Sequence, residues 1–125
     1  MDKLFRITTE GAGEESRPDP ARLVAGDPVF TTWNVEEAEG LYAGTWRSTP
    51  GRWRVVYTEW EYCRIVSGRS VIHGPDGALE VGPGDGFVLR PGFEGEWEVV
   101  ETTVKEYVVR EYTRFNSRWR VQRVS

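Results

Sequence analysis

The feature that most limits the fold of this chain is a succession of short segments that begins at Val29 and is interrupted every few residues by Gly, Pro or Asp. Each segment has the length of a strand and is rich in the β-branched and aromatic residues that favour strands. The segments are VFTTWN, LYAGTWRS, RWRVVYTE, EYCRIVS, RSVIHG, ALEV, GFVLR, GEWEVV and TVKEYVVREYT. No stretch has a helical period, so the pattern predicts an all-β sandwich or barrel.

Turn-forming residues predict where the strands are connected. Ser67-Gly68 and Gly74-Pro75-Asp76-Gly77 each indicate a hairpin, because Gly and Pro suit the central positions of tight turns. Gly84-Asp85 and Gly92 indicate two further turns, in which glycine can adopt a positive φ.

The length of 125 residues predicts one domain with a buried core. Residues 1–27 are expected to form an irregular lead-in, because Gly, Glu and Ser are frequent there and Pro18 and Pro20 oppose a helix. Residues 28–125 are expected to form the barrel domain. It ends in a strand at residues 118–121, with Trp119 and Val121 facing inward and the arginines in solvent. The local excess of arginine could also bind an anionic partner, but a solvated face is the preferred interpretation.

Composition excludes several classes of protein. The 16 basic and 20 acidic residues give a net charge of -4, which argues against a nucleic-acid partner. No apolar run approaches the roughly 20 residues of a membrane span, and we see no secretory signal, so a cytoplasmic protein without a membrane partner is expected. The single cysteine, Cys63, fits a reducing compartment. The single histidine, His73, excludes a metal site with two histidines from this chain.

A longer pattern begins with W-x-S-x-P-G at Trp46 and continues through Glu61-Tyr62-Cys63 and Gly68. It extends to Asp76-Gly77, Gly84-Asp85, Gly92-Phe93, Gly95, Trp97-Glu98-Val99, Lys105 and Tyr107. Over about residues 28–110 this order resembles the cupin family that includes the cupin domain of (S)-ureidoglycine aminohydrolase and the ethanolamine-utilisation cupins, in particular its small stand-alone members. The resemblance implies a double-stranded β-helix, or jelly-roll, barrel that is usually dimeric. We therefore expect a homodimer, which the outward-facing aromatic residues Trp60 and Tyr62 also favour.

The resemblance also locates the metal-ligand positions of the aminohydrolase branch. They fall on Val55, Tyr57, Glu61 and Gly95, of which only Glu61 could bind a metal. Zinc, manganese or iron needs three or four N, O or S ligands. We therefore expect no metal and no other cofactor, and we expect Gly95 to leave space where a ligand would stand.

Alternation predicts that Tyr57, Glu59, Glu61, Cys63 and Ile65 share one face of a strand. The resemblance turns this face into the barrel, where residues of other strands would join it to form an aromatic-walled pocket typical of small-molecule sites. The expected pocket residues are Trp53, Tyr57, Glu59, Glu61, Cys63, Trp97, Lys105 and Tyr107.

Five of these residues are weighed for a specific role. Glu61 and Lys105 are expected to form a buried pair with Tyr57 nearby, either for structure or as a ligand clamp or proton-transfer couple. Glu59 beside Glu61 would raise one carboxyl pKa for general acid or base work, although a position in solvent at the barrel mouth is preferred. Cys63 could be a nucleophile, but a buried apolar thiol is the preferred interpretation.

The sequence therefore predicts a metal-independent protein that binds a small polar metabolite, either nitrogen-containing or a carboxylate, inside the barrel. An alternative is an enzyme, a hydrolase or isomerase, that uses Glu61, Tyr57 and Lys105 as acid–base groups or has a non-standard metal site. A third interpretation is a structural dimer with a vestigial pocket. In all three, His73 is expected to be an exposed turn residue.

Overall fold

The computed structural model describes residues 3–115 and 118–120 and contains eleven strands and no helix over these residues. Accordingly, the described part of the chain has no helix long and apolar enough to cross a membrane. The strands are β1 (Glu14–Ser16), β2 (Leu23–Gly26), β3 (Phe30–Ala38), β4 (Leu41–Ser48), β5 (Gly51–Val56), β6 (Trp60–Gly74), β7 (Gly77–Val81), β8 (Gly86–Leu89), β9 (Glu94–Arg110), β10 (Thr113–Phe115) and β11 (Arg118–Arg120). The all-β prediction is confirmed.

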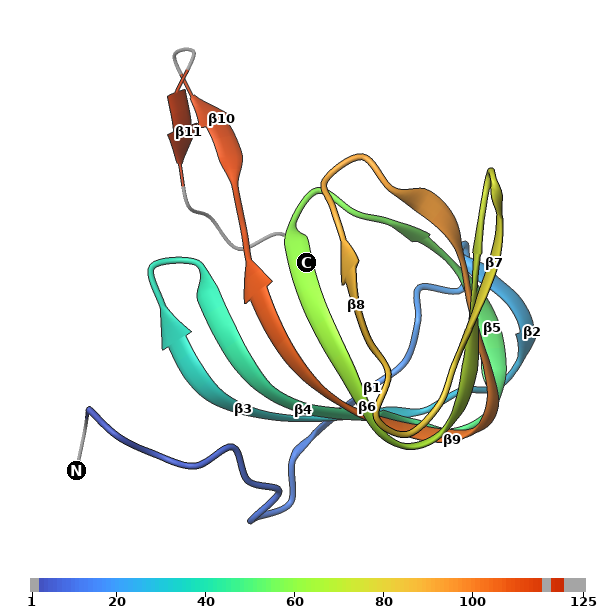
Figure 1. Cartoon of the computed structure of the whole chain (residues 1–125), viewed down its shortest axis with the longest axis horizontal. Helices are drawn as coiled ribbons and strands as arrows, with labels where there is room; N and C mark the ends of the chain where they lie inside the picture. The colour runs from blue at the N-terminus through green and yellow to red at the C-terminus, as the bar shows by residue number, and fades with distance from the viewer. Residues whose placement is uncertain (1–2, 116–117, 121–125) are drawn as a thin grey trace.

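Nine of the described strands form one antiparallel sheet organised by its two long members, β6 and β9. These strands pair with each other from Trp60↔Arg110 to His73↔Glu96. On its other edge β9 pairs first with β5 and then with β4, and β6 pairs first with β8 and then with β7. Each long strand therefore pairs with the other long strand and with two shorter strands. The sheet curls around an interior (Figure 1).

The predicted hairpin at Ser67-Gly68 is wrong, because β6 continues through it as a bulged strand. The register between β6 and β9 shifts three times between Ile65 and Ser70. Gly68 has a φ of 85°, and a Cβ there would lie 1.9 Å from the Thr102 carbonyl oxygen. A bulge bends its strand and increases the local twist, so this glycine helps the sheet to curl. The hairpin at residues 74–77 is confirmed by the pairing of Gly74 with Gly77.

The lead-in is more regular than predicted. Its short strand β1 pairs with β3, and β2 pairs with β5, so residues 14–16 and 23–26 extend the sheet at two of its edges. At the other end of the chain, β11 pairs with β10 in a separate two-stranded ribbon instead of joining the barrel sheet. The predicted inward orientation of the Trp119 side chain, and residue Val121 as a whole, lie outside what the structure describes.

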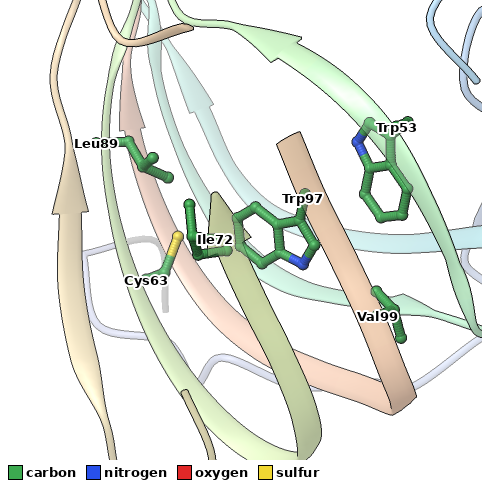
Figure 2. Close-up of a cluster of buried hydrophobic side chains, with 6 residues drawn as sticks. All are labelled: Trp53, Cys63, Ile72, Leu89, Trp97 and Val99. Atoms are coloured by element: carbon green, nitrogen blue, oxygen red, sulfur yellow. The ribbon is translucent and has the colours of Figure 1, made fainter. Parts of the chain in front are cut away.

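The core of the barrel is aromatic. Its buried cluster consists of Trp53, Cys63, Ile72, Leu89, Trp97 and Val99 (Figure 2). Trp53 and Trp97 face each other across β5 and β9 with ring centroids 6.5 Å apart and planes within 7°. Trp46 packs edge-on against Trp97 at 5.6 Å. Large rings of this kind supply much of the buried apolar area of a small domain and fix its interior shape.

Candidate functional site

The centre of the site is a buried ion pair between β6 and β9. The Lys105 Nζ donates a hydrogen bond to Glu61 Oε2 at 2.8 Å, and the Tyr57 hydroxyl donates one to Glu61 Oε1 at 2.7 Å. Glu61 is 6% exposed and Lys105 is 5% exposed. The prediction that these two side chains meet inside the barrel with Tyr57 nearby is therefore confirmed as geometry.

Two tryptophans enclose the ammonium group of Lys105. Its Nζ lies 4.6 Å from the ring centroid of Trp46 and 4.4 Å from that of Trp97. Both distances are in the range of cation–π attraction, which strengthens where water is excluded. The sequence alone did not assign Trp46 to the site. Its position beside Lys105 follows from the register between β4 and β9, which pairs the two residues.

The pKa values of three groups in this cluster are shifted away from neutral pH. Burial opposes the charged form of Lys105, but Cys63 and Glu61 outweigh it, and the pKa of Lys105 lies above its usual value. Burial and the charge of Glu61 raise the pKa of Tyr57, and burial raises the pKa of the Cys63 thiol. At neutral pH the cluster therefore contains an ammonium, a phenol and a thiol, none of which is close to giving up its proton.

A cavity of about 730 Å³ opens beside the ion pair. It is walled by β3, β4 and β9 and, on one side, by residues between Thr8 and Ser16, where the Trp33 indole Nε1 donates to the Gly11 carbonyl at 3.1 Å. The aromatic residues in its lining are Trp33, Tyr42, Trp46 and Tyr107. The charged residues in its lining are Glu10, Glu14, Glu37, Glu59, Glu61, Glu111 and Lys105.

The charge of the cavity is strongly negative. Of the described residues that line it, six are glutamates and one is a lysine, and the Lys105 ammonium is paired with Glu61. The Tyr107 hydroxyl donates to Asn34 Oδ1 at 2.6 Å and so fixes part of the polar wall. A low-dielectric cavity of this kind attracts cations and repels anions.

Half of the predicted pocket residues line this cavity: Glu59, Glu61, Lys105 and Tyr107. Tyr57 is not part of the cavity lining, but its hydroxyl donates a hydrogen bond to Glu61. The prediction is wrong for Trp53, Cys63 and Trp97, which belong to the packed core (Figure 2). The physical reason is size, because the rings of the core and of Trp46 together fill this part of the barrel, and the cavity lies on its β3 and β4 side.

Glu59 lies in the connection before β6, so the predicted alternation from Tyr57 to Ile65 holds only from Glu61 onward. Its carboxylate accepts a hydrogen bond from the Thr58 backbone N–H at 3.1 Å. Burial, together with the charges of Glu61 and Glu111, raises the pKa of Glu59 despite that hydrogen bond. Glu59 is half-buried at the cavity. This position is intermediate between the two that the sequence left open, one inside the barrel beside Glu61 and one in solvent at the barrel mouth.

His73 is not an exposed turn residue as predicted. It lies in β6, opposite Ala78 and Glu96, and its Nε2 is 2.8 Å from Glu98 Oε1. Arg52 pairs with the same carboxylate at 3.7 Å. The hairpin turn begins one residue later than the histidine, so His73 takes part in a half-buried charge cluster on β5, β6 and β9.

Gly95 does not leave the space that its position suggested. It pairs directly with Val55, and a Cβ at Gly95 would lie 2.0 Å from the His73 carbonyl oxygen and 2.8 Å from the Phe93 ring. The expectation of a vacated ligand position is wrong. Glycine is present because β6 and Phe93 approach the backbone too closely for any side chain.

The four positions of the family-type metal site do not fit a metal. Val55 and Gly95 have no ligating atom, and both carboxylate oxygens of Glu61 already accept hydrogen bonds. The ammonium group of Lys105 would also repel a cation bound to Glu61. No group of three or more His, Cys, Asp or Glu residues within residues 3–115 and 118–120 is arranged to hold a metal ion.

The curled antiparallel sheet with a polar cluster and a cavity in its interior is the architecture of the cupins. A family model described as the EutQ-like cupin domain matches residues 35–107, and the chain belongs to this family. No curated protein matches the sequence. The part of the sequence resemblance that concerns (S)-ureidoglycine aminohydrolase remains a prediction.

Several solved structures are similar. A protein of unknown function from Pseudomonas syringae pv. tomato, of the DUF861 family, has a TM-score of 0.74 and 26% identity, over 82% of this chain and 46% of that protein. The Clostridium difficile EutQ protein has a TM-score of 0.61 and 14% identity, over 66% and 63%. A putative ethanolamine utilization protein Q from Salmonella typhimurium has a TM-score of 0.60 and 13% identity, over 80% and 98%. The chain spans about half the length of the Pseudomonas protein.

The role of Gly95 can be tested by comparing two alanine variants. Gly95→Ala should destabilise the protein by about 2 kcal/mol or more, because the new methyl group collides with backbone that cannot move alone. Gly82→Ala is the matched control, since its Cβ would meet nothing closer than 3.9 Å. Urea unfolding measures both. Equal stability of the two variants would show that the position has room after all.

Alkaline pH should destabilise the fold through the buried cluster. The pKa values of Lys105, Tyr57 and Cys63 are all raised in the native state, so between the ordinary and the raised values the native state binds more protons than the unfolded chain. Stability must then fall as pH rises through that interval, which begins near the ordinary thiol pKa of about 8.5.

Urea unfolding at pH 7, 9 and 10.5 measures this loss. Tyr57→Phe and Cys63→Ala should each lose less stability between pH 7 and pH 10.5 than the unsubstituted protein, because each removes one linked proton. Identical pH dependence in the variants and the unsubstituted protein would contradict the assignment.

Proposed function

We propose that this protein is a metal-independent binding protein for a small organic cation, such as a protonated or quaternary amine, which it holds in the 730 Å³ cavity. The observation that carries the proposal is the composition of the cavity wall. Among the described residues, six glutamates, four aromatic side chains and one lysine line it, and that lysine is paired with Glu61. The sequence suggests either a nitrogen-containing metabolite or a carboxylate. The acidic cavity wall favours the nitrogen-containing metabolite in its cationic form.

The aromatic residues support the same class of ligand. Trp33, Tyr42 and Tyr107 present rings to a space whose other walls are acidic. A cation over an aromatic face gains from the ring quadrupole, and a carboxylate at a short distance adds Coulomb attraction. A carboxylate ligand would meet the glutamates instead, and Lys105, the lysine of the described lining, is already paired with Glu61.

A binding role in the cytoplasm, without nucleic acid or membrane, is the setting that we propose. The negative net charge argues against a nucleic-acid partner. The single cysteine, the buried Cys63, is in keeping with a reducing compartment.

The second candidate function is an acid–base enzyme, a hydrolase or isomerase, and one observation favours it. Glu59 is a cavity carboxyl whose pKa is raised mainly by burial, as a general base or acid requires. The set predicted from the sequence, Glu61, Tyr57 and Lys105, is less suited to catalysis, because these groups bond to one another. In this alternative Glu59 exchanges the proton with the substrate.

Calorimetric titration with matched probes tests the cation proposal. Choline and other small ammonium ions should bind, whereas 3,3-dimethyl-1-butanol, the neutral shape analogue of choline, and trimethylacetate should not. Binding should weaken with added salt, since charge attraction is screened. Glu59→Gln should lower the affinity roughly tenfold by removing one cavity charge. Glu80→Gln, on β7 and outside the cavity, is the control. Preferential binding of trimethylacetate would contradict the proposal.

Elemental analysis tests the metal-independent part. The purified protein should contain no stoichiometric manganese, iron or zinc, because Glu61 is occupied by its two hydrogen-bond donors. One equivalent of metal per chain that disappears in Glu61→Gln, while Glu80→Gln retains it, would contradict this expectation.

A further inference from the structure

Carboxylates stand at both ends of the row of strands that walls the cavity beside the ion pair. The strands follow the order β1-β3-β4-β9, and β6 pairs with β9 next to them (Figure 1). Glu59 lies in the connection before β6, at one end of the row, where the charges of Glu61 and Glu111 act on it. Glu14 lies in β1 at the other end, in the lead-in that also contributes Glu10. The cavity is therefore acidic at two separate places.

The register of the sheet gives the separation of these places. Lys105 pairs with Trp46, which pairs with Thr32. Thr32 in turn pairs with Glu14. Residues directly opposite each other in neighbouring strands have their side chains on the same face, and all four residues line the cavity. Strands lie about 4.8 Å apart, so Glu14 stands three strand spacings, or about 14 Å along the sheet, from Lys105.

The lead-in that contains Glu14 is fixed against β3. β1 is an antiparallel partner of β3, and just before it the Trp33 indole Nε1 donates to the Gly11 carbonyl at 3.1 Å. A Cβ at Gly13 would lie 2.7 Å from the Thr31 Cγ2 atom, so the two backbones pack closely at this point. The backbone beside Glu14 is therefore ordered before any ligand arrives, which favours binding.

Within the part of the chain that the structure describes, no ion pair involves Glu14 or Glu59. Arg17, the next basic residue along the chain after Glu14, pairs with Asp27 at 2.8 Å. The ammonium group of Lys105, which lies between the two ends, is paired with Glu61. Each end of the cavity can therefore attract a positive charge of a ligand.

The wall between the two ends is aromatic. Trp33 belongs to β3, Tyr42 and Trp46 belong to β4, and Tyr107 belongs to β9, the three strands that separate β1 from β6. Such rings offer apolar surface to an uncharged hydrocarbon chain. The cavity volume of about 730 Å³ is within the range of about 300–1,000 Å³ that is usual for drug-sized ligands, so an extended chain has room.

We propose that the ligand of this cavity is a linear α,ω-diamine. One ammonium group lies at Glu59, the other lies at Glu14, and the methylene chain crosses the aromatic wall between them. This inference rests on the proposed function and narrows its ligand class from small organic cations to dications with a long uncharged spacer. A monoamine occupies one end only, and a short diamine does not reach both carboxylates.

Calorimetric titration with two pairs of matched probes tests the distance between the charges. 1,8-Diaminooctane and 8-amino-1-octanol have the same chain length and differ in one terminal charge. The diamine should bind at least about tenfold more tightly, because its second ammonium reaches a second carboxylate. The shorter pair, 1,4-diaminobutane and 4-amino-1-butanol, controls for a general attraction of the acidic cavity for a second charge, and no such difference is expected for it.

Three glutamine variants assign the two ends. Glu14→Gln should abolish the advantage of 1,8-diaminooctane and leave the affinity for 8-amino-1-octanol unchanged, whereas Glu59→Gln should weaken the binding of both. Glu15→Gln is the matched control, because it removes the same charge from β1 at a position outside the described cavity lining. This variant should bind both probes like the unsubstituted protein. Circular dichroism spectra check that all three variants are folded.

The outcomes separate this inference from the proposed function. Equal affinity of the unsubstituted protein for 1,8-diaminooctane and 8-amino-1-octanol, with both bound, would overturn the inference and leave the cation site intact. The inference would also fail if Glu14→Gln and Glu15→Gln lost the same affinity, or if the shorter pair showed the same advantage for its diamine. Failure of all four probes to bind would contradict the proposed function, and the inference with it.

Discussion

The buried pair of Glu61 and Lys105 is the interaction on which the interior of this barrel depends. A carboxylate or an ammonium alone at this depth would face a desolvation penalty of several kcal/mol. Together they neutralise each other at 2.8 Å, and Tyr57 satisfies the second carboxylate oxygen. Because Glu61 belongs to β6 and Lys105 to β9, the pair also joins the two long strands around which the sheet is organised.

The same pair divides the interior into two parts. On one side Trp97, Trp53 and their neighbours exclude water and form the core. On the other side the cavity is open and acidic. Lys105 faces both, with its ammonium between Trp46 and Trp97 and its charge satisfied by Glu61. In this chain a lysine supplies the positive charge that Glu61 needs, so the barrel can keep a buried carboxylate without a metal ion.

Alternation of side chains along a strand, together with the resemblance to the cupins that turns one face into the barrel, was enough to predict the interior pair of Glu61 and Lys105. Properties that depend on pairing between distant strands could not be derived in this way. Trp46 meets Lys105 through the β4–β9 register, and residues 8–16 wall the cavity only because β1 adds to β3. Ser67-Gly68 was misinterpreted because glycine in an apolar segment indicates a turn or a bulge equally well. Gly95 gave no signal of the backbone that packs against it.

A double-mutant cycle on the buried pair tests the central claim most directly. Glu61→Leu and Lys105→Met each leave one buried charge without its partner and should each lower the free energy of unfolding by about 3–5 kcal/mol. The double variant removes both charges and should cost clearly less than the sum of the single variants, because the two positions are coupled. Urea unfolding of the four proteins gives the coupling energy. Additive costs would contradict the account, since they would mean that the two side chains stabilise the barrel independently.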